Sequence, residues 1–334
     1  MIPLLIGIPA VLAVLFQFVR NEKARGYIVY AGAGIIMLTT VVFVVRWVTA
    51  GAQTRTFYPE TELIDHLMTA GDIFLMCLII YLSVKYGKVL PIILSVVQTA
   101  VVLYTEFTAE VTEGPHMAVD WLTILMCIII AFIGGFICIY TVGYMKGYHN
   151  HHKEVKDRQP FFFSMLFLFL AAMFGLVLSQ NLIWIYFFWE ITSVISFLMI
   201  GYTRTDEAVN NSFCALWMNL LGGLGFAVAI AFMAQIYGNL QLVDVVEIGA
   251  LLPLMCLSLA GMTKSAQLPF STWLLGAMVA PTPSSALLHS ATMVKAGVYL
   301  LIRLSPALEG NMVGLIVSSI GGFTFIMASM MAIA

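Results

Sequence analysis

The chain has 334 residues, of which 61% are hydrophobic and only 10% are charged, with a mean hydropathy of +1.00 and a formal net charge of −2. A water-soluble core cannot hide so much apolar surface, so the composition excludes an ordinary soluble domain and indicates a polytopic membrane protein. The near-neutral net charge says little about partners, because membrane proteins sort their charges between the two sides of the bilayer.

Apolar stretches that can cross a bilayer follow one another along the whole chain. A transmembrane helix needs about 20 mostly apolar residues. The first stretch has no basic start and no small-residue cleavage site, so it is predicted to be a retained helix and not a signal peptide. We predict an all-α transmembrane bundle of about 11 helices, at 2–19, 27–49, 70–86, 89–108, 118–143, 160–179, 182–202, 210–237, 249–269, 283–303 and 312–334.

The loops between these stretches differ in charge. Alternate threading from an external N-terminus collects most Lys and Arg residues on one side and most carboxylates on the other. Short cytoplasmic loops are rich in Lys and Arg, so the N-terminus is predicted to lie outside. Asp72 is expected near the start of its helix, where an acid favours the helix dipole, and Asp120 with Trp121 is expected to anchor the interface.

Motifs for cofactor chemistry are missing from the sequence. The five cysteines lie in apolar stretches and form no CxxC pair, which predicts neither an iron–sulfur nor a zinc site. The loop with His149, His151 and His152 lacks i, i+4 spacing and nearby thiolates, so it is interpreted as a solvated turn and not a metal site. No phosphate loop, dinucleotide fingerprint or nucleic-acid surface is encoded. We therefore expect no metal, cofactor or redox centre on this chain, and no nucleic-acid partner.

Three ionisable residues fall at membrane depth, namely Glu190, Lys264 and Lys295. A charge near the bilayer centre costs about 2.5–3.5 kcal/mol, so each needs a partner or a hydrated cavity. One interpretation is a structural Glu190–Lys264 ion pair that only docks two helices, but it leaves Lys295 without an acid. The other is a relay, because a buried lysine that exchanges its proton is a proton carrier.

Spacing favours the relay. His289, Thr292 and Lys295 follow one another in steps of three, which places them along one helix with a rise of about 9 Å. His289 alone is equally compatible with a hydrogen bond between helices. We predict a relay with Glu190, Lys264, His289, Thr292 and Lys295.

A broken helix is expected near Lys264–Pro269. Pro269 has no amide donor for the carbonyl of Ser265, and broken helices at membrane depth are tolerated where they line a hydrated cavity. Ser265 and Gln267 are expected to hold water beside the break.

Three segments carry a family resemblance, over about residues 118–334. They read DWLTILMCIIIAFIGGFICIYTVGYM, WEITSVISFLMIGY and KSAQLPFSTWLLGAMVAPTPSSALLHSATMVKAGVYLL. These segments resemble the antiporter-like subunit family, which comprises proton-translocating subunits of complex I, of energy-converting hydrogenases and formate hydrogenlyases, and of Mrp-type cation/proton antiporters.

The resemblance implies roles for individual residues. Glu190 matches the family's helix-borne glutamate, Lys264 its lysine in a discontinuous helix, and His289 and Lys295 its connecting groups. It implies a switching Glu–Lys contact, in which the lysine holds its proton near the acid and passes it on when the two separate.

The resemblance also implies a domain organisation. Residues 1–117 are expected to form N-terminal transmembrane helices with an added helix pair at 70–108, which has no expected role beyond docking neighbouring subunits. Residues 118–311 are expected to form an antiporter-like core with the first five-helix repeat. Residues 312–334 would begin a second, inverted repeat that is otherwise absent, so either the sequence is a fragment or a separate polypeptide supplies that half.

The expected function is translocation of protons, or of sodium, by a non-redox subunit of a redox-driven complex of the hydrogenase or formate hydrogenlyase type. This branch is favoured because Leu220 follows Asn219 where the large complex I subunit has an arginine, and because Lys295 replaces a neutral residue. Expected partners are other hydrophobic membrane subunits, a chain with the second repeat, lipid, and peripheral redox subunits with NiFe and iron–sulfur centres, in the cytoplasmic (inner) membrane of a bacterium or archaeon. The alternatives are an Mrp-type antiporter subunit, a complex I antiporter-like subunit and a purely structural scaffold.

Overall fold

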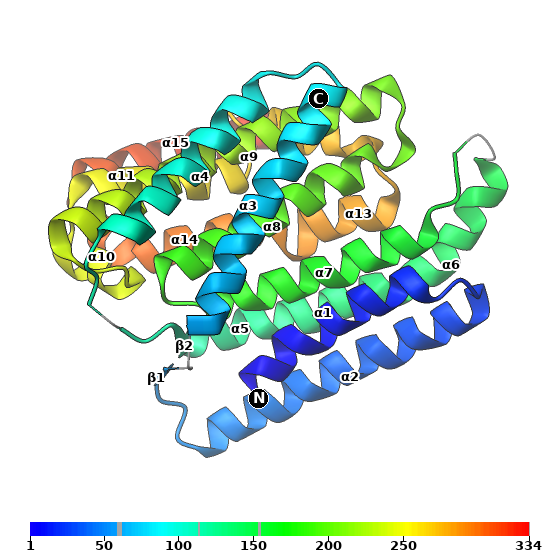
Figure 1. Cartoon of the computed structure of the whole chain (residues 1–334), viewed down its shortest axis with the longest axis horizontal. Helices are drawn as coiled ribbons and strands as arrows, with labels where there is room; N and C mark the ends of the chain where they lie inside the picture. The colour runs from blue at the N-terminus through cyan, green and yellow to red at the C-terminus, as the bar shows by residue number, and fades with distance from the viewer. Residues whose placement is uncertain (59–61, 113, 153–154, 334) are drawn as a thin grey trace.

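The computed structural model describes residues 1–58, 62–112, 114–152 and 155–333, and within them the chain is a bundle of helices (Figure 1). Nine of its helical segments are long and apolar enough to cross a membrane, which confirms the predicted all-α transmembrane class. They are α2 (Glu22–Thr49), α3 (Glu62–Lys85), α4 (Leu90–Thr108), α5 (Trp121–Ile129) with α6 (Gly135–His151), α7 (Gln159–Leu178), α8 (Leu182–Ile200), α9 (Asp206–Phe232), α13 (Thr282–Ala286) with α14 (Met293–Leu308), and α15 (Met312–Ile333).

The other two predicted stretches are also helical but shorter, and fall on α1 and α11. Residue 334, at the end of the last predicted stretch, lies outside the described residues. Three π-helical turns interrupt the long segments, at Ile130–Gly134, Met233–Tyr237 and Leu287–Ala291. The remaining elements are α1 (Ile2–Phe18), α10 (Leu242–Ile248), α11 (Leu251–Lys264), α12 (Thr272–Gly276), two 3₁₀ turns (Gly201–Thr203 and Ala277–Val279), and the antiparallel strands β1 (Arg55–Phe57) and β2 (Met117–Val119).

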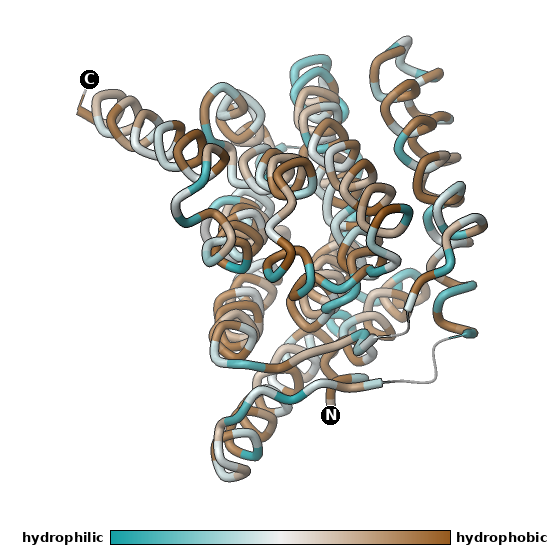
Figure 2. The backbone as a smooth tube through the Cα atoms, turned by 90° about the vertical axis from the view of Figure 1, so that its left-hand side faces the viewer, coloured by the Kyte–Doolittle hydropathy of each residue, from teal (hydrophilic) through white to brown (hydrophobic). Residues whose placement is uncertain are grey.

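Burial follows the distribution of apolar residues around each helix. Helix α7 is apolar on all sides, and 89% of its membrane-spanning window is buried, as expected for a helix at the centre of a bundle. It packs between α1 and α8, and α8 in turn packs against α9. Helix α15 lies at the edge, with none of its spanning window buried (Figure 2). The α7–α8–α9 layer is therefore the rigid centre of the protein.

The added helix pair, α3 and α4, packs on this centre. Helix α3 lies along α8, and α4 lies along α9 (Figure 1). The first of the pair begins at Glu62 and not at residue 70. Consequently Asp72 is not near a helix start, as the sequence predicted, but lies in the third turn of α3, where it is buried.

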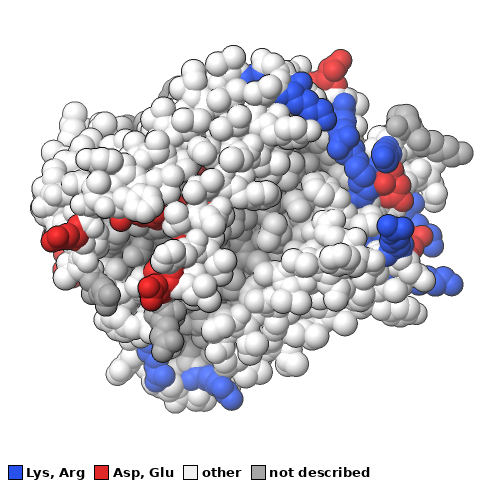
Figure 3. Space-filling view, viewed as in Figure 1, with Lys and Arg blue, Asp and Glu red and all other residues white. Residues whose placement is uncertain are grey.

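Charged residues gather at opposite ends of the bundle, as Figure 3 shows. Most Lys and Arg side chains lie at one end, and carboxylates dominate the other, which agrees with the charge sorting read from the loops. We call the second end the carboxylate-rich end.

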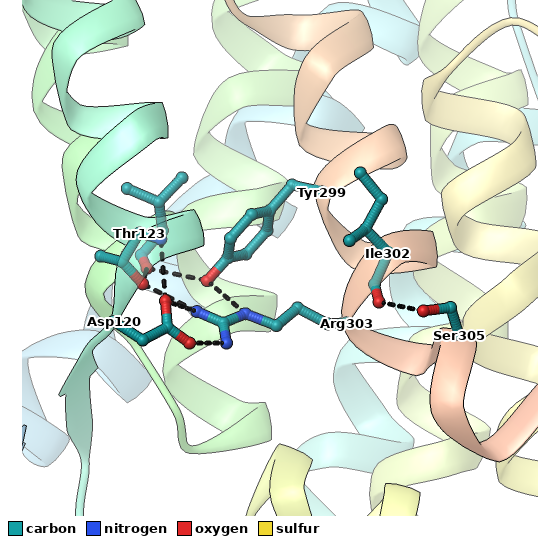
Figure 4. Close-up of polar contacts among 7 residues, drawn as sticks. Asp120, Thr123, Tyr299, Ile302, Arg303 and Ser305 are labelled. Carbon is teal, nitrogen blue, oxygen red and sulfur yellow. Dashed lines mark hydrogen bonds and ion pairs between the residues drawn. The ribbon is translucent and has the colours of Figure 1, made fainter. Parts of the chain in front are cut away.

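One charged network ties α14 to the start of α5 (Figure 4). Asp120 is the N-cap of α5 and accepts a hydrogen bond from the Thr123 amide at 2.9 Å. Arg303 on α14 forms an ion pair with Asp120 and donates to Thr123 Oγ1 at 2.7 Å and to the Tyr299 hydroxyl at 3.0 Å. Tyr299 donates to the Val177 carbonyl at 2.9 Å, so the network also reaches α7. Asp120 therefore does more than anchor the interface, since it also locks two transmembrane helices together.

The ion pair predicts a pH-dependent stability. Burial raises the pKa of Asp120, but the hydrogen bonds from Arg303 and the Thr123 amide outweigh burial and hold the pKa below its usual range. A carboxylate with a lowered pKa stabilises the fold above its unfolded pKa of about 3.9, and loses this contribution as the pH falls through the folded value. Asp120→Asn keeps the N-cap but removes the charge. We expect it to lower the free energy of unfolding by about 1.5–3 kcal/mol at neutral pH.

Thermal unfolding in detergent at neutral and acidic pH checks this prediction. The difference between wild type and Asp120→Asn is expected to shrink at acidic pH, where the wild-type carboxylate is also neutral. Glu309→Gln is the matched control, because Glu309 is an exposed carboxylate at the end of the same helix α14. A difference that stays constant across the pH range would rule out the ion pair as its cause.

Candidate ion-relay site

Lys264 is the last residue of α11, and the end of this helix is a Schellman motif. The Gln267 amide donates to the Met262 carbonyl at 3.0 Å, and the Ala266 amide donates to the Thr263 carbonyl at 3.2 Å. Ala266 has a φ of +53°, the left-handed conformation that this motif requires. The predicted break is confirmed, but it precedes Pro269 by four residues. Its local cause is therefore the left-handed turn at Ala266 and not the missing amide of Pro269.

The Lys264 side chain is fully buried and points to α8. Its Nζ donates to the Trp189 carbonyl at 3.0 Å and to Ser193 Oγ at 2.8 Å. The ammonium also lies 4.8 Å from the centre of the Trp189 ring. A carbonyl, a hydroxyl and an aromatic face all favour a cation, so α8 offers Lys264 a site that compensates part of its desolvation.

Glu190 is buried on α8 directly after Trp189, with 3% of its surface exposed. Its Oε1 atom has no hydrogen-bond partner within the described part of the chain, and neither has Oε1 of the buried Gln98 on α4. Both atoms lie beside Gly223 of α9, where a Cβ atom would come within 2.4 Å of Glu190 Oε1 and 2.7 Å of Gln98 Oε1. Glycine at this position therefore leaves the space that the two polar groups share.

Glu190 and Lys264 interact electrostatically without touching. Among the residues that the structure describes, their carboxylate and ammonium form no direct ion pair, although each lies within the electrostatic field of the other. Lys264 is instead bonded to the backbone of the preceding residue, Trp189. The pair is thus arranged as two neighbouring titratable groups with separate hydrogen-bond environments.

The residues predicted to support the break have different surroundings. Ser265 Oγ donates to the Gly261 carbonyl at 2.7 Å, so its hydroxyl is engaged within the helix end. Gln267 Oε1 has no partner in the described residues and faces α15 near Gly321. Pro269 follows a cis peptide bond, and the neighbouring Leu268 amide donates to Thr324 Oγ1 of α15 at 3.1 Å. The broken segment is therefore bound to α15.

Residues 283–303 do not form the continuous helix that the predicted staircase requires. His289 lies in the π-helical turn, and Thr292 adopts φ −143° and ψ −60° between this turn and α14. Thr292 Oγ1 donates to the Leu287 carbonyl at 2.9 Å. His289 Nε2 has no partner in the described residues. The regular i, i+3 spacing from His289 to Thr292 is therefore wrong, because the backbone changes its winding between them.

Lys295 is exposed on α14. The opposite side of the helix carries Gly297, which packs so closely on α11 that a Cβ atom there would lie 3.1 Å from Lys264 Cβ and 2.4 Å from the Gly261 carbonyl oxygen. Because residues 295 and 297 are about 160° apart around a helix, Lys295 points away from Lys264. The expectation that Lys295 is enclosed within this chain is not met, and the structure does not bring it together with Glu190 and Lys264.

Two buried polar residues beside Glu190 were missed by the sequence analysis. Asp72 on α3 is 5% exposed and interacts electrostatically with Glu190, while Gln98 on α4 is 1% exposed and interacts with the same carboxyl group. The spacing of Asp65, Thr69 and Asp72 by four and three residues was the available signal, since it places all three on one helix face. In the described residues, no group of three or more His, Cys, Asp or Glu side chains is arranged to hold a metal ion.

Two family models match the sequence. Residues 179–334 match the model described as NADH:quinone oxidoreductase/Mrp antiporter, transmembrane, and residues 115–153 match that of the complex I chain 5 N-terminus. The first range contains Glu190, Lys264 and His289, but neither range includes α3 or α4.

Curated relatives and solved structures are similar to the same part of the chain. The "Putative antiporter subunit mnhA2" of Staphylococcus aureus (strain JH9) is 37% identical over 227 residues, 65% of this chain and 28% of the relative. A probable K(+)/H(+) antiporter protein of Rhizobium meliloti (strain 1021) is 33% identical over 288 residues, 82% of this chain and 27% of the relative. The chain thus spans less than a third of the length of these relatives.

Among solved structures, a chain of the Mrp complex from Dietzia sp. DQ12-45-1b is 27% identical, with a TM-score of 0.54 over 75% of this chain and 29% of that one. A chain of the membrane-bound sulfane sulfur reductase, an archaeal respiratory membrane complex, gives a TM-score of 0.66 over 91% of this chain and 54% of that one. The second alignment has only 15% identity and concerns the fold alone.

The contact at Gly223 predicts a sensitive position. Gly223→Ala places a methyl group against Glu190 and Gln98, and overpacking of this kind costs about 1–3 kcal/mol. Gly34→Ala in α2 is the matched control, because nothing lies within 4 Å of its Cβ position and alanine favours a helix. We expect a lower thermal midpoint for Gly223→Ala and an unchanged or higher one for Gly34→Ala. Equal midpoints would mean that the space at Gly223 is not tight.

Proposed function

The chain belongs to the antiporter-like family of membrane subunits of Mrp antiporters and complex I, and we propose that it translocates protons in exchange for a monovalent cation as part of an Mrp-type multisubunit complex. One observation of the structure supports this proposal above the others. Lys264 is a fully buried lysine, held on α8 by hydrogen bonds, one residue from the buried Glu190. Such a charge at membrane depth is typical of an ion path.

The relay starts from this pair. The Trp189 carbonyl and Ser193 hydroxyl hold the protonated Lys264 beside Glu190. When the ammonium leaves this position it loses both acceptors and the field of Glu190, which makes release of its proton easier. The free Nε2 atom of His289 is the proposed next acceptor, with Thr292 and then Lys295 as later groups. Lys295 requires a neighbouring subunit or water at its exposed face to take part.

A redox-driven complex of the hydrogenase or formate hydrogenlyase type is the second candidate. Its support is the similarity in fold over 91% of the chain, which includes N-terminal helices and carries no information about the driving reaction. In that case NiFe and iron–sulfur centres would reside on peripheral partner subunits. Co-purification from the native membrane separates the candidates, since metal-containing subunits support the redox-driven complex and only hydrophobic subunits support the Mrp type.

Lys264→Ala tests the relay in membrane vesicles that contain the assembled complex. We expect proton translocation to fall about tenfold or more, which corresponds to about 1.4 kcal/mol or more on the transfer barrier. The assay is repeated with Na⁺ and with K⁺ to identify the exchanged cation. Lys23→Ala is the matched control, because Lys23 is an exposed lysine on α2.

The structural alternative predicts another result. If Glu190 and Lys264 only dock α8 and α11, the joint change Glu190→Gln and Lys264→Met leaves a neutral, well-packed pair and transport continues. Transport by this double variant at the wild-type rate would therefore refute the relay.

A further inference from the structure

The added helix pair carries a line of polar side chains that ends at Glu190. On α3, Asp65, Thr69 and Asp72 lie on one face, because they are separated by four and three residues. Thr69 Oγ1 donates to Glu106 Oε2 of α4 at 3.1 Å. Trp184 Nε1 of α8 donates to Asp65 Oδ1 at 2.7 Å. The face therefore points to α4 and α8 and not to the lipid.

Helix α4 completes the line from the other side. Glu106 and Thr99 are seven residues apart, as are Thr105 and Gln98, so these four side chains follow two adjacent rows along the helix. Gln98, Thr99 and Thr105 are buried. Both Gln98 and Thr99 also interact with the hydroxyl of the buried Tyr186 on α8. We call the polar groups of α3, α4 and α8 between Asp65 and Glu190 the polar seam.

A cavity of about 700 Å³ forms the outer end of the polar seam. Asp65, Thr69 and Glu106 line it, together with the exposed residues Tyr58 and Phe107. The exposed lining residues show that the cavity opens to the surface. Asp65 lies in the first turn of α3 and Glu106 in the last turn of α4, so the opening is at the carboxylate-rich end.

The inner end of the polar seam holds unpaired acceptors. Glu190 and Gln98 are at least 97% buried, and the Oε1 atom of each has no hydrogen-bond partner in the described residues. Asp72 lies between the two ends, within the electrostatic reach of both Glu106 and Glu190. Three carboxyl groups that repel one another when ionised add nothing to helix packing, so their grouping has no structural explanation.

We propose that the polar seam conducts protons from the carboxylate-rich end to Glu190, with Asp72 as the intermediate carrier between the cavity and Glu190. A carboxyl group accepts a proton on one oxygen and releases it to water or to a second acid, and the hydroxyl groups of the seam orient that water. This inference rests on the proposed function, because it supplies the relay at Glu190 with its proton. It gives the added pair α3–α4 a function in transport, in addition to contact with neighbouring subunits.

Asp72→Asn tests the proposal in vesicles with the assembled complex. Asparagine keeps the size but cannot carry a proton, so we expect proton translocation to fall about tenfold. Asp72→Glu, which restores a carboxyl group, is expected to recover at least part of the rate. Ser83→Ala is the matched control, since Ser83 is a buried polar residue of the same helix outside the seam. A wild-type rate for a folded Asp72→Asn complex would overturn the proposal.

The same assay with Glu190→Gln separates this inference from the proposed function. If Glu190→Gln stops transport and Asp72→Asn does not, the relay stands and the polar seam is not its entry. If Glu190→Gln leaves transport unchanged, the relay itself fails, and the seam has no acceptor to supply.

A chemical test does not depend on the stability of Asp72 variants. Thr69→Cys places a thiol in the cavity, where a membrane-impermeant, negatively charged thiosulfonate reagent can reach it from the carboxylate-rich end. Modification from that side is expected to slow proton translocation, whereas the reagent on the opposite side has no effect. The wild-type chain, with its exposed Cys77 on the same helix, is the control for native thiols. Complete modification of Thr69→Cys without a change in rate would overturn the proposal.

Discussion

The contact between Lys264 and α8 governs the geometry of the whole site. A lysine enclosed in a transmembrane bundle is unfavourable unless acceptors surround its ammonium group. The Trp189 carbonyl and the Ser193 hydroxyl provide them, and both come from one turn of α8. For Lys264 to reach this turn, α11 must end at Lys264, and the left-handed turn at Ala266 is what ends it.

Close helix packing places the two charged groups near each other without joining them. Glycine at 223 leaves room on α9 for Glu190 and Gln98, and glycine at 297 lets α14 approach the end of α11. Small residues are what allow such approach between transmembrane helices. Because Lys264 is bonded to backbone and hydroxyl acceptors and not to Glu190 itself, a proton can change the balance of the pair without breaking a full ion pair.

The two ends of the bundle contribute differently to the site. The carboxylate-rich end has a cavity that leads into the polar seam and toward Glu190, whereas the broken helix and the π-helical turn at His289 lie on the other side of Lys264. The Asp120–Arg303 network holds α14 to α5 and α7 at one end of this arrangement. Irregular backbone is thus confined to the segments from Ser265 to Thr292, while rigid helices hold Glu190 and Asp72. This division is what a switchable path between fixed acids requires.

Hydropathy and charge along the chain are enough to establish the class of the protein, the positions of its helices, and Glu190 and Lys264 as buried groups. Apolar length alone locates a spanning helix, and a charge within such a stretch stands out whatever the packing. Hydropathy does not define which way a side chain points, so the folded chain was needed to show that Lys295 is exposed and that the π-helical turn breaks the spacing between His289 and Thr292. Nor does apolar length detect the polar first turns of α3, which are helical because they pack against α4 and α8. Those turns make Asp72 a neighbour of Glu190, and a contact between helices distant in sequence is decided by packing alone.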